Sequence, residues 1–197
     1  IEFEFNNYIK NQAPSSNDNT CLITMYEFDT SIDICERDGK KIENLSVEKV
    51  PYYNLVPRGM TRLMDAIGTV TVDRGKYFSS LPEALRPGKI LFVVVTDGIE
   101  NDSRVYDSKK VKEMMETQKT KYNWEYVFIG AGLKDLSDAK ALNFKLGNTS
   151  NFDKTGDGIK NMFASLTSGT QCYRGMSHDS YIAQVQSDEV GFFQVTK

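Results

Sequence analysis

Apolar residues along this 197-residue chain follow two patterns that alternate from residue 57 onward. One pattern is the short, nearly continuous apolar run, which is clearest at residues 90–95 and recurs at residues 124–129. Runs of this length that are rich in β-branched and aromatic residues are typical of strands buried on both faces of a sheet. The other pattern, in which apolar residues recur every three or four positions, predicts amphipathic helices.

The two patterns predict an α/β protein whose strands alternate with helices. Such alternation favours a mainly parallel sheet with helices on both of its faces. Strands are expected at residues 90–96, 124–130 and 143–146, and helices at residues 61–80, 106–121, 133–142 and 158–166.

The N-terminal part of the chain follows other patterns. Residues 1–12 fit a strand by the alternation of residues 1–5, or a helix by the spacing of Phe5, Tyr8 and Ile9, and we favour the helix. Residues 21–28 and 31–36 are β-type runs separated by a polar pair, which predicts an antiparallel hairpin at a sheet edge.

The length of the chain favours one domain with a single core. We assign this domain to residues 1–174. Residues 175–197 show no clear pattern and are expected to be a C-terminal extension.

Charge and cysteine content restrict the class of protein. A net charge of −3 provides no basic surplus for phosphates, so neither nucleic acid nor a membrane surface is an expected partner. Three widely spaced cysteines without a C-x-x-C pair, together with one histidine, argue against a disulfide framework and a zinc site. With no membrane-spanning stretch or signal peptide in the sequence, we expect a cytoplasmic protein.

Two side chains are candidates for metal chemistry. Asp97 follows the strand at residues 90–96, at the carboxyl edge where open α/β sheets place their ligands. Thr61 stands at the start of the preceding helix. A carboxylate and a hydroxyl are oxygen ligands suited to Mg²⁺ or Mn²⁺. Each residue alone also has an ordinary interpretation, Asp97 as a turn residue and Thr61 as a helix cap.

Together, the two segments resemble motifs of a known family. Residues 59–67, Gly-Met-Thr-Arg-Leu-Met-Asp-Ala-Ile, resemble the threonine motif of von Willebrand factor A domains, and residues 95–101, Val-Thr-Asp-Gly-Ile-Glu-Asn, resemble their aspartate-glycine motif. The resemblance runs from about Phe5 to Arg174 and is closest to stand-alone A domains of bacteria and their phages. It implies a doubly wound, mainly parallel α/β sheet with an antiparallel edge hairpin. For a phage-encoded protein, the location would be the host cytoplasm or the virion.

The resemblance also implies a metal-ion-dependent adhesion site. Thr61 would coordinate Mg²⁺ or Mn²⁺ directly, and Asp97 would do so directly or through a water. An acidic side chain of a partner protein would complete the coordination, which is binding rather than enzymatic turnover. The residues implied to form the surrounding binding surface are Gly59, Met60, Gly98, Glu100 and Asn101.

The first motif of the family, Asp-x-Ser-x-Ser after the central strand, is absent from its expected place. Residues 29–33, Asp-Thr-Ser-Ile-Asp, match only its first two members and lie between the predicted hairpin strands. Residues 1–12 are therefore interpreted as the end of the helix that follows this motif. On that interpretation the central strand lies upstream of Ile1, or another segment replaces it.

Two other functions remain open. One is a Mg²⁺-dependent phosphoryl-transfer or hydrolytic enzyme that uses Asp97 and Glu100 as metal ligands. The next strand ends in Ile-Gly-Ala-Gly at residues 129–132, which offers such an enzyme no reactive group. The other is a structural subunit, for example of a phage particle, that has lost the metal.

Overall fold

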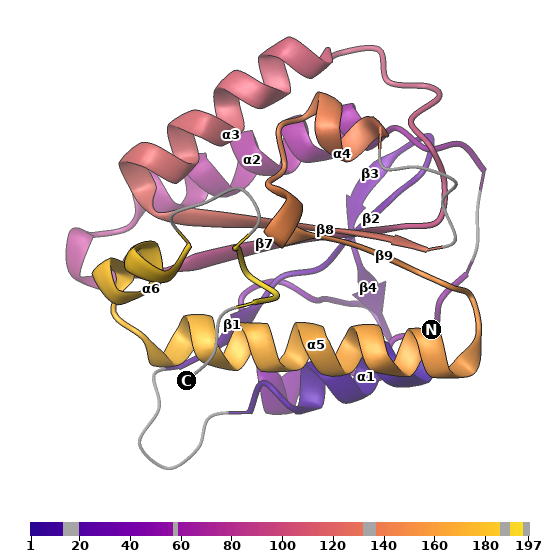
Figure 1. The fold of residues 1–197 in the computed structure, drawn as a ribbon, viewed down its shortest axis with the longest axis horizontal. Coiled ribbons are helices and arrows are strands. Elements are labelled where there is room, and N and C mark those ends of the chain that lie inside the picture. Colours follow the sequence, from indigo (N-terminus) through magenta and orange to yellow (C-terminus); the bar gives the residue numbers. More distant parts are fainter. Residues whose placement is uncertain (14–19, 57–58, 132–136, 186–189, 195–197) are drawn as a thin grey trace.

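The fold is described by a computed structural model that covers residues 1–13, 20–56, 59–131, 137–185 and 190–194. A parallel sheet lies at its centre, in the order β7-β8-β9 (Figure 1). The strands are β7 (Ile90–Thr96), β8 (Trp124–Ala131) and β9 (Thr149–Phe152). In register, Ile90 pairs with Trp124 and Phe128 pairs with Thr149. The predicted α/β class and the two long strands are confirmed.

Helices cover both faces of this sheet (Figure 1). One layer contains α1 (Glu2–Lys10) and α5 (Gly156–Gly175), and the other contains α2 (Leu63–Ser80), α3 (Ser108–Tyr122) and α4 (Ser137–Ala141). Successive side chains of a strand point to opposite faces. Accordingly, Val127 and Ile129 of β8 pack in the core of the first layer, and Tyr126 and Phe128 pack in that of the second.

The N-terminal region contains three small antiparallel pairs. β2 (Tyr26–Phe28) and β3 (Ile32–Ile34) form the predicted hairpin. The run at residues 21–28 is divided, because its first part, β1 (Leu22–Ile23), pairs instead with β6 (Leu45–Ser46). A further hairpin joins β4 (Glu36–Arg37) to β5 (Lys40–Lys41). Its two turn residues, Asp38 and Gly39, both have positive φ angles, as tight hairpin turns require.

The last strand of the sheet is not where the sequence predicted it. Residues 143–146 form no strand, because Asn143 takes a left-handed conformation after α4 and Leu146 begins the 3-10 helix η3 (Leu146–Asn148). The strand that pairs with β8 is instead β9, which directly follows η3. Short 3-10 turns also occur at η1 (Val47–Lys49) and η2 (Glu83–Leu85).

The helix predicted at residues 158–166 is much longer in the structure. α5 begins after Thr155, whose side chain caps it, and continues to Gly175. Gly169 weakens the helical pattern in the sequence but has a packing role. A Cβ atom at this position would lie 2.6 Å from Cε1 of Phe192, so only glycine lets this ring lie against the helix.

Residues beyond 174 contribute to the core. The helix α6 (His178–Gln184) places Tyr181 in the same apolar cluster as Tyr173 of α5, with Val185 and Phe192. None of the helices in the described ranges combines the length and apolar character required to cross a lipid bilayer.

The burial of β7 differs from the expectation. Only Val94 and Thr96 of this strand are buried, whereas residues 126–129 of β8 are completely inaccessible to solvent. The apolar composition of the two strands is similar, so the difference comes from position. β8 has a strand on each side, while β7 has one on only one side within the described part of the chain.

Candidate functional site

The two loops that carry the family-like motifs meet at the carboxyl end of β7. After Thr96, whose hydroxyl accepts a hydrogen bond from the amide of Gly98 at 3.2 Å, the chain turns toward Thr61. A Cβ atom on Gly98 would lie 2.3 Å from Oγ1 of Thr61. The threonine hydroxyl therefore lies directly against the backbone of Gly98. The structure brings these two predicted residues together.

Asn101 fixes the backbone of Thr61. The Thr61 amide donates to Oδ1 of Asn101 at 2.9 Å, and the Asn101 amide donates to the Thr61 carbonyl at 3.1 Å. Each residue thus supplies both a donor and an acceptor to the other. This pair holds the segment before α2 against the loop after β7.

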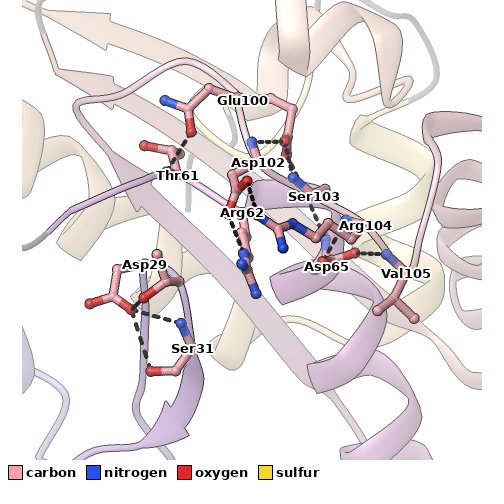
Figure 2. A network of polar contacts seen from close by, with 12 residues as sticks. Asp29, Ser31, Thr61, Arg62, Asp65, Glu100, Asp102, Ser103, Arg104 and Val105 are labelled. Atoms are coloured by element: carbon pink, nitrogen blue, oxygen red, sulfur yellow. Dashed lines mark hydrogen bonds and ion pairs between the residues drawn. The ribbon is translucent and has the colours of Figure 1, made fainter.

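Glu100 is used inside the loop rather than presented to a ligand. Its carboxylate accepts hydrogen bonds from the amides of Asp102 and Ser103 and from the Ser103 hydroxyl, at 2.7 to 3.0 Å (Figure 2). It also accepts a hydrogen bond from the amide of Met64 at 2.9 Å. The Met64 amide belongs to the first turn of α2, where amides have no partner within the helix. Glu100 therefore caps α2. The interpretation of Thr61 as a helix cap is wrong, because α2 begins after Arg62 and the acceptors for its first turn come from this loop.

Asp65 is a second anchor that the sequence did not reveal. This residue is 2% exposed, and its carboxylate accepts hydrogen bonds from the amides of Arg104 and Val105, each at 2.8 Å (Figure 2). The amide of Tyr106 donates a third hydrogen bond to it, also at 2.8 Å. Burial alone would raise the pKa of Asp65, but the three amides and the nearby charge of Arg62 lower it below its ordinary value. An aspartate in a first helical turn is common, so nothing in the sequence distinguished this one.

An ion pair connects the same elements. Nε of Arg62 lies 2.7 Å from Oδ2 of Asp102, and a guanidinium nitrogen of Arg104 lies 2.9 Å from Oδ1 of the same carboxylate (Figure 2). Hydrogen bonds from these two guanidinium groups lower the pKa of Asp102. The loop of residues 98–106 is thus attached to the start of α2 by several polar contacts and presents a defined surface.

Asp97 has a different environment. Its side chain is 69% exposed, and Oδ2 lies 3.1 Å from the ammonium group of Lys154, which follows β9. Lys154 is not among the predicted site residues, because β9 lies at Thr149–Phe152 and not at residues 143–146. Asp97, Thr61 and Met60 line one end of a large cavity that runs beside β7.

The remaining predicted residues lie close by. Met60 is 44% exposed and offers an apolar side chain at this end of the cavity. Gly59 is exposed, and a Cβ atom there would be 4.0 Å from Cγ2 of Thr30, in the turn between β2 and β3. In that turn, Asp29 accepts a hydrogen bond from the Ser31 amide at 2.8 Å. The segment at residues 29–33 is therefore a hairpin turn.

The residues present fit a divalent cation in ligand type but not in number. The Thr61 hydroxyl and the Asp97 carboxylate are oxygen donors of the kind that Mg²⁺ prefers. Mg²⁺ requires about six such ligands. Within the described ranges, no three His, Cys, Asp or Glu side chains are grouped closely enough to hold a metal ion. Further ligands would have to be waters or groups from another segment.

The chain was compared with protein-family models, with curated proteins and with solved structures. None of the three comparisons found a match. The functional conclusion therefore depends on the chemistry of this site.

Proposed function

We propose that the chain is a divalent-metal-dependent protein-interaction domain with the doubly wound fold of von Willebrand factor A domains. Thr61 and Asp97 would be ligands of Mg²⁺ or Mn²⁺, and a carboxylate of a partner protein would occupy a remaining coordination position. The observation that supports this most strongly is the contact between Thr61 and Gly98. It joins the threonine motif to the aspartate-glycine motif at one end of the parallel sheet.

The surrounding contacts suit a binding site that is held in one shape. Asn101 would position Thr61 through its two hydrogen bonds, as residues outside the coordination sphere commonly orient metal ligands. Gly59 and Gly98 would leave room for a close approach, and the exposed Met60 would contact the partner. The remaining metal ligands would be waters or groups from another segment.

The enzyme alternative is less well supported. It requires Glu100 as a second metal carboxylate, but this side chain accepts four hydrogen bonds from its own loop and from α2. The neighbouring strand β8 ends at Ala131 without a reactive side chain, and Gly132 lies outside the described residues.

A specific contact favours a second candidate, the structural subunit without metal. Lys154 already provides a positive charge beside Asp97, so the carboxylate has a counter-ion even without Mg²⁺. For either candidate we propose a cytoplasmic location, or the host cytoplasm or virion for a phage protein. The odd, widely spaced cysteines support a reducing compartment.

Paramagnetic broadening by Mn²⁺ separates these candidates. If the metal site forms, Mn²⁺ at sub-stoichiometric concentration broadens the NMR signals of Thr61 and Gly98, and Mg²⁺ in excess restores them. Asp97→Ala and Thr61→Ala abolish the effect. Glu113→Ala, which removes an exposed carboxylate from α3, leaves it unchanged. Absence of broadening in the full-length protein, or broadening that survives Asp97→Ala, would reject metal binding at this site.

A further inference from the structure

The loop that carries Asp97 is bonded to α4 as well as to α2. We call residues 97–101, the first part of this loop, the site loop. Oδ2 of Asp138, in the first turn of α4, accepts a hydrogen bond from the amide of Glu100 at 2.8 Å. The two residues are 38 positions apart in the chain, so this bond is a product of the tertiary fold and not of local sequence.

The parallel sheet brings Asp138 to this place. Thr96, the last residue of β7, pairs with Gly130 of β8, so the chain leaves both strands at the same edge of the sheet. Ala139 of α4 and Leu142, directly after α4, are buried in the core of the second helix layer. These apolar contacts make α4 a fixed support from which Asp138 reaches the site loop.

The backbone of the site loop is held at three points. At its start, Gly98 exchanges two hydrogen bonds with the Thr96 hydroxyl, at 3.0 and 3.2 Å. At its end, Asn101 exchanges two hydrogen bonds with Thr61. Asp138 holds the loop between these points. A backbone fixed in this way loses little freedom when a ligand binds, which favours affinity.

Glu100 lies between two helices. Its amide donates to Asp138 of α4, whereas its carboxylate accepts a hydrogen bond from the Met64 amide of α2 at 2.9 Å. The position of Glu100 therefore depends on both helices. Because Gly98 is only two residues away, a shift of Glu100 would change the close contact between Gly98 and Oγ1 of Thr61.

We propose that Asp138 is a positioning residue for the site of Thr61 and Asp97. Its carboxylate oxygen fixes the amide of Glu100 and thereby holds Gly98 against the Thr61 hydroxyl. It acts through the backbone of the site loop, as residues outside a coordination sphere commonly orient the metal ligands. The consequence for metal binding rests on the proposed function, whereas the consequence for the loop does not.

Two substitutions separate the hydrogen bond of Asp138 from its charge. Asp138→Asn keeps a side-chain oxygen that can accept from the Glu100 amide and removes the charge. Asp138→Ala removes both, and alanine has the highest helix propensity, so α4 is kept. Asp179→Ala is the matched control, because it removes an exposed carboxylate from the first turn of another short helix, α6.

The first measurement is made without metal, in EDTA. In Asp138→Ala, we expect the NMR amide signals of Gly98 and Thr61 to shift and the Glu100 amide to exchange with solvent about tenfold faster or more. Asp138→Asn should keep the signals and the exchange rate close to those of the unmodified protein, and Asp179→Ala should leave them unchanged. Unchanged signals of β8, the middle strand, show that each variant is folded.

The second measurement uses Mn²⁺ alone as the probe. Asp138→Ala is expected to weaken Mn²⁺ binding by about tenfold or more, while Asp138→Asn restores binding close to that of the unmodified protein. Equal weakening in both variants would overturn the proposal, because the charge of Asp138 and not its hydrogen bond would then matter.

The metal-free measurement decides the positioning role by itself. If the Gly98 and Thr61 signals stay in place in Asp138→Ala, Asp138 does not position the site loop and the proposal is rejected. If these signals shift but the unmodified protein binds no Mn²⁺, the positioning role stands and the proposed function fails. The two failures are therefore distinguishable.

Discussion

Thr61 and Asn101 exchange two hydrogen bonds, so the segment before α2 and the loop after β7 are held together by a reciprocal pair. Asn101→Ala removes the side-chain acceptor and leaves the Thr61 amide without its partner. We expect the free energy of unfolding to fall by about 1 kcal/mol, because the site is partly exposed and water replaces the lost bond. Urea denaturation at neutral pH measures this change.

Asn101→Asp is the control, because its carboxylate keeps an oxygen at the accepting position. It is expected to retain most of the stability that Asn101→Ala loses. If both variants lost the same amount, the hydrogen bond to the Thr61 amide would not be the source of the effect.

The contact between Gly98 and Thr61 predicts that the stability cost of a substitution at Gly98 depends on the side chain at residue 61. In Gly98→Ala the new Cβ atom would lie 2.3 Å from Oγ1 of Thr61, and we expect a loss of about 1–3 kcal/mol. Thr61→Ala removes the clashing oxygen, after which the new methyl group would be 3.4 Å from the Cβ atom of residue 61. The double variant should therefore be more stable than the sum of the two single losses predicts.

Gly88→Ala is the matched control for this cycle, because nothing lies within 4 Å of a Cβ atom at that position. Thermal unfolding of the four proteins and the control measures the coupling. Strictly additive losses would show that the two residues are not in contact.

The sequence predicted for a physical reason that the segment of Thr61 and the end of β7 lie at the same edge of the sheet. The strong apolar run of β7 and the periodicity of α2 identified both elements, and the ends of such elements gather at one edge of a parallel sheet. The contacts of Asp65 could not be predicted in the same way. They depend on how the loop of residues 98–106 folds back over α2, and local sequence carries little information about that path.

The errors in the C-terminal half have equally specific causes. β9, Thr-Ser-Asn-Phe, is short and mostly polar, so its sequence lacks the pattern of a buried strand. Gly169 interrupts the helical pattern in the sequence, so the length of α5 was underestimated. The reason for a glycine at this position is its contact with Phe192, which lies far along the chain. In both places tertiary contacts outweigh local preference.

The lowered pKa of Asp65 predicts that the free energy of unfolding depends on pH. The pKa of this carboxyl group is lowered in the folded protein, so its charged form stabilises the fold at neutral pH. That contribution is complete above the ordinary aspartate pKa of about 3.9 and is lost as the pH falls below it. We expect Asp65→Ala to lower the free energy of unfolding by about 2–3 kcal/mol at pH 7, because three loop amides lose their acceptor.

The pH dependence itself separates charge from packing. As the pH falls below the ordinary aspartate pKa of about 3.9, the penalty of Asp65→Ala should shrink, since the charged form then contributes less to stability. Glu113→Gln, on the exposed side of α3, should change stability by less than about 0.5 kcal/mol. A penalty for Asp65→Ala that is the same at pH 7 and pH 3 would contradict a role for the charge.

The position of Lys154 beside Asp97 predicts that its ammonium group competes with a divalent cation for this carboxylate. Its ammonium group lies 3.1 Å from the carboxylate, and a divalent cation bound to the same oxygen would be repelled by it. Lys154→Gln removes this charge. If Thr61 and Asp97 bind Mg²⁺, the association constant measured by isothermal titration should rise by about 3–10-fold in the variant, and the gain should shrink at high salt.

Lys160→Gln makes the same change in net charge on an exposed part of α5 and controls for long-range electrostatics. An equal gain in both variants would mean that only the overall charge matters. If neither variant bound Mg²⁺, Lys154 would be the structural counter-ion of Asp97, as expected of a subunit that works without metal.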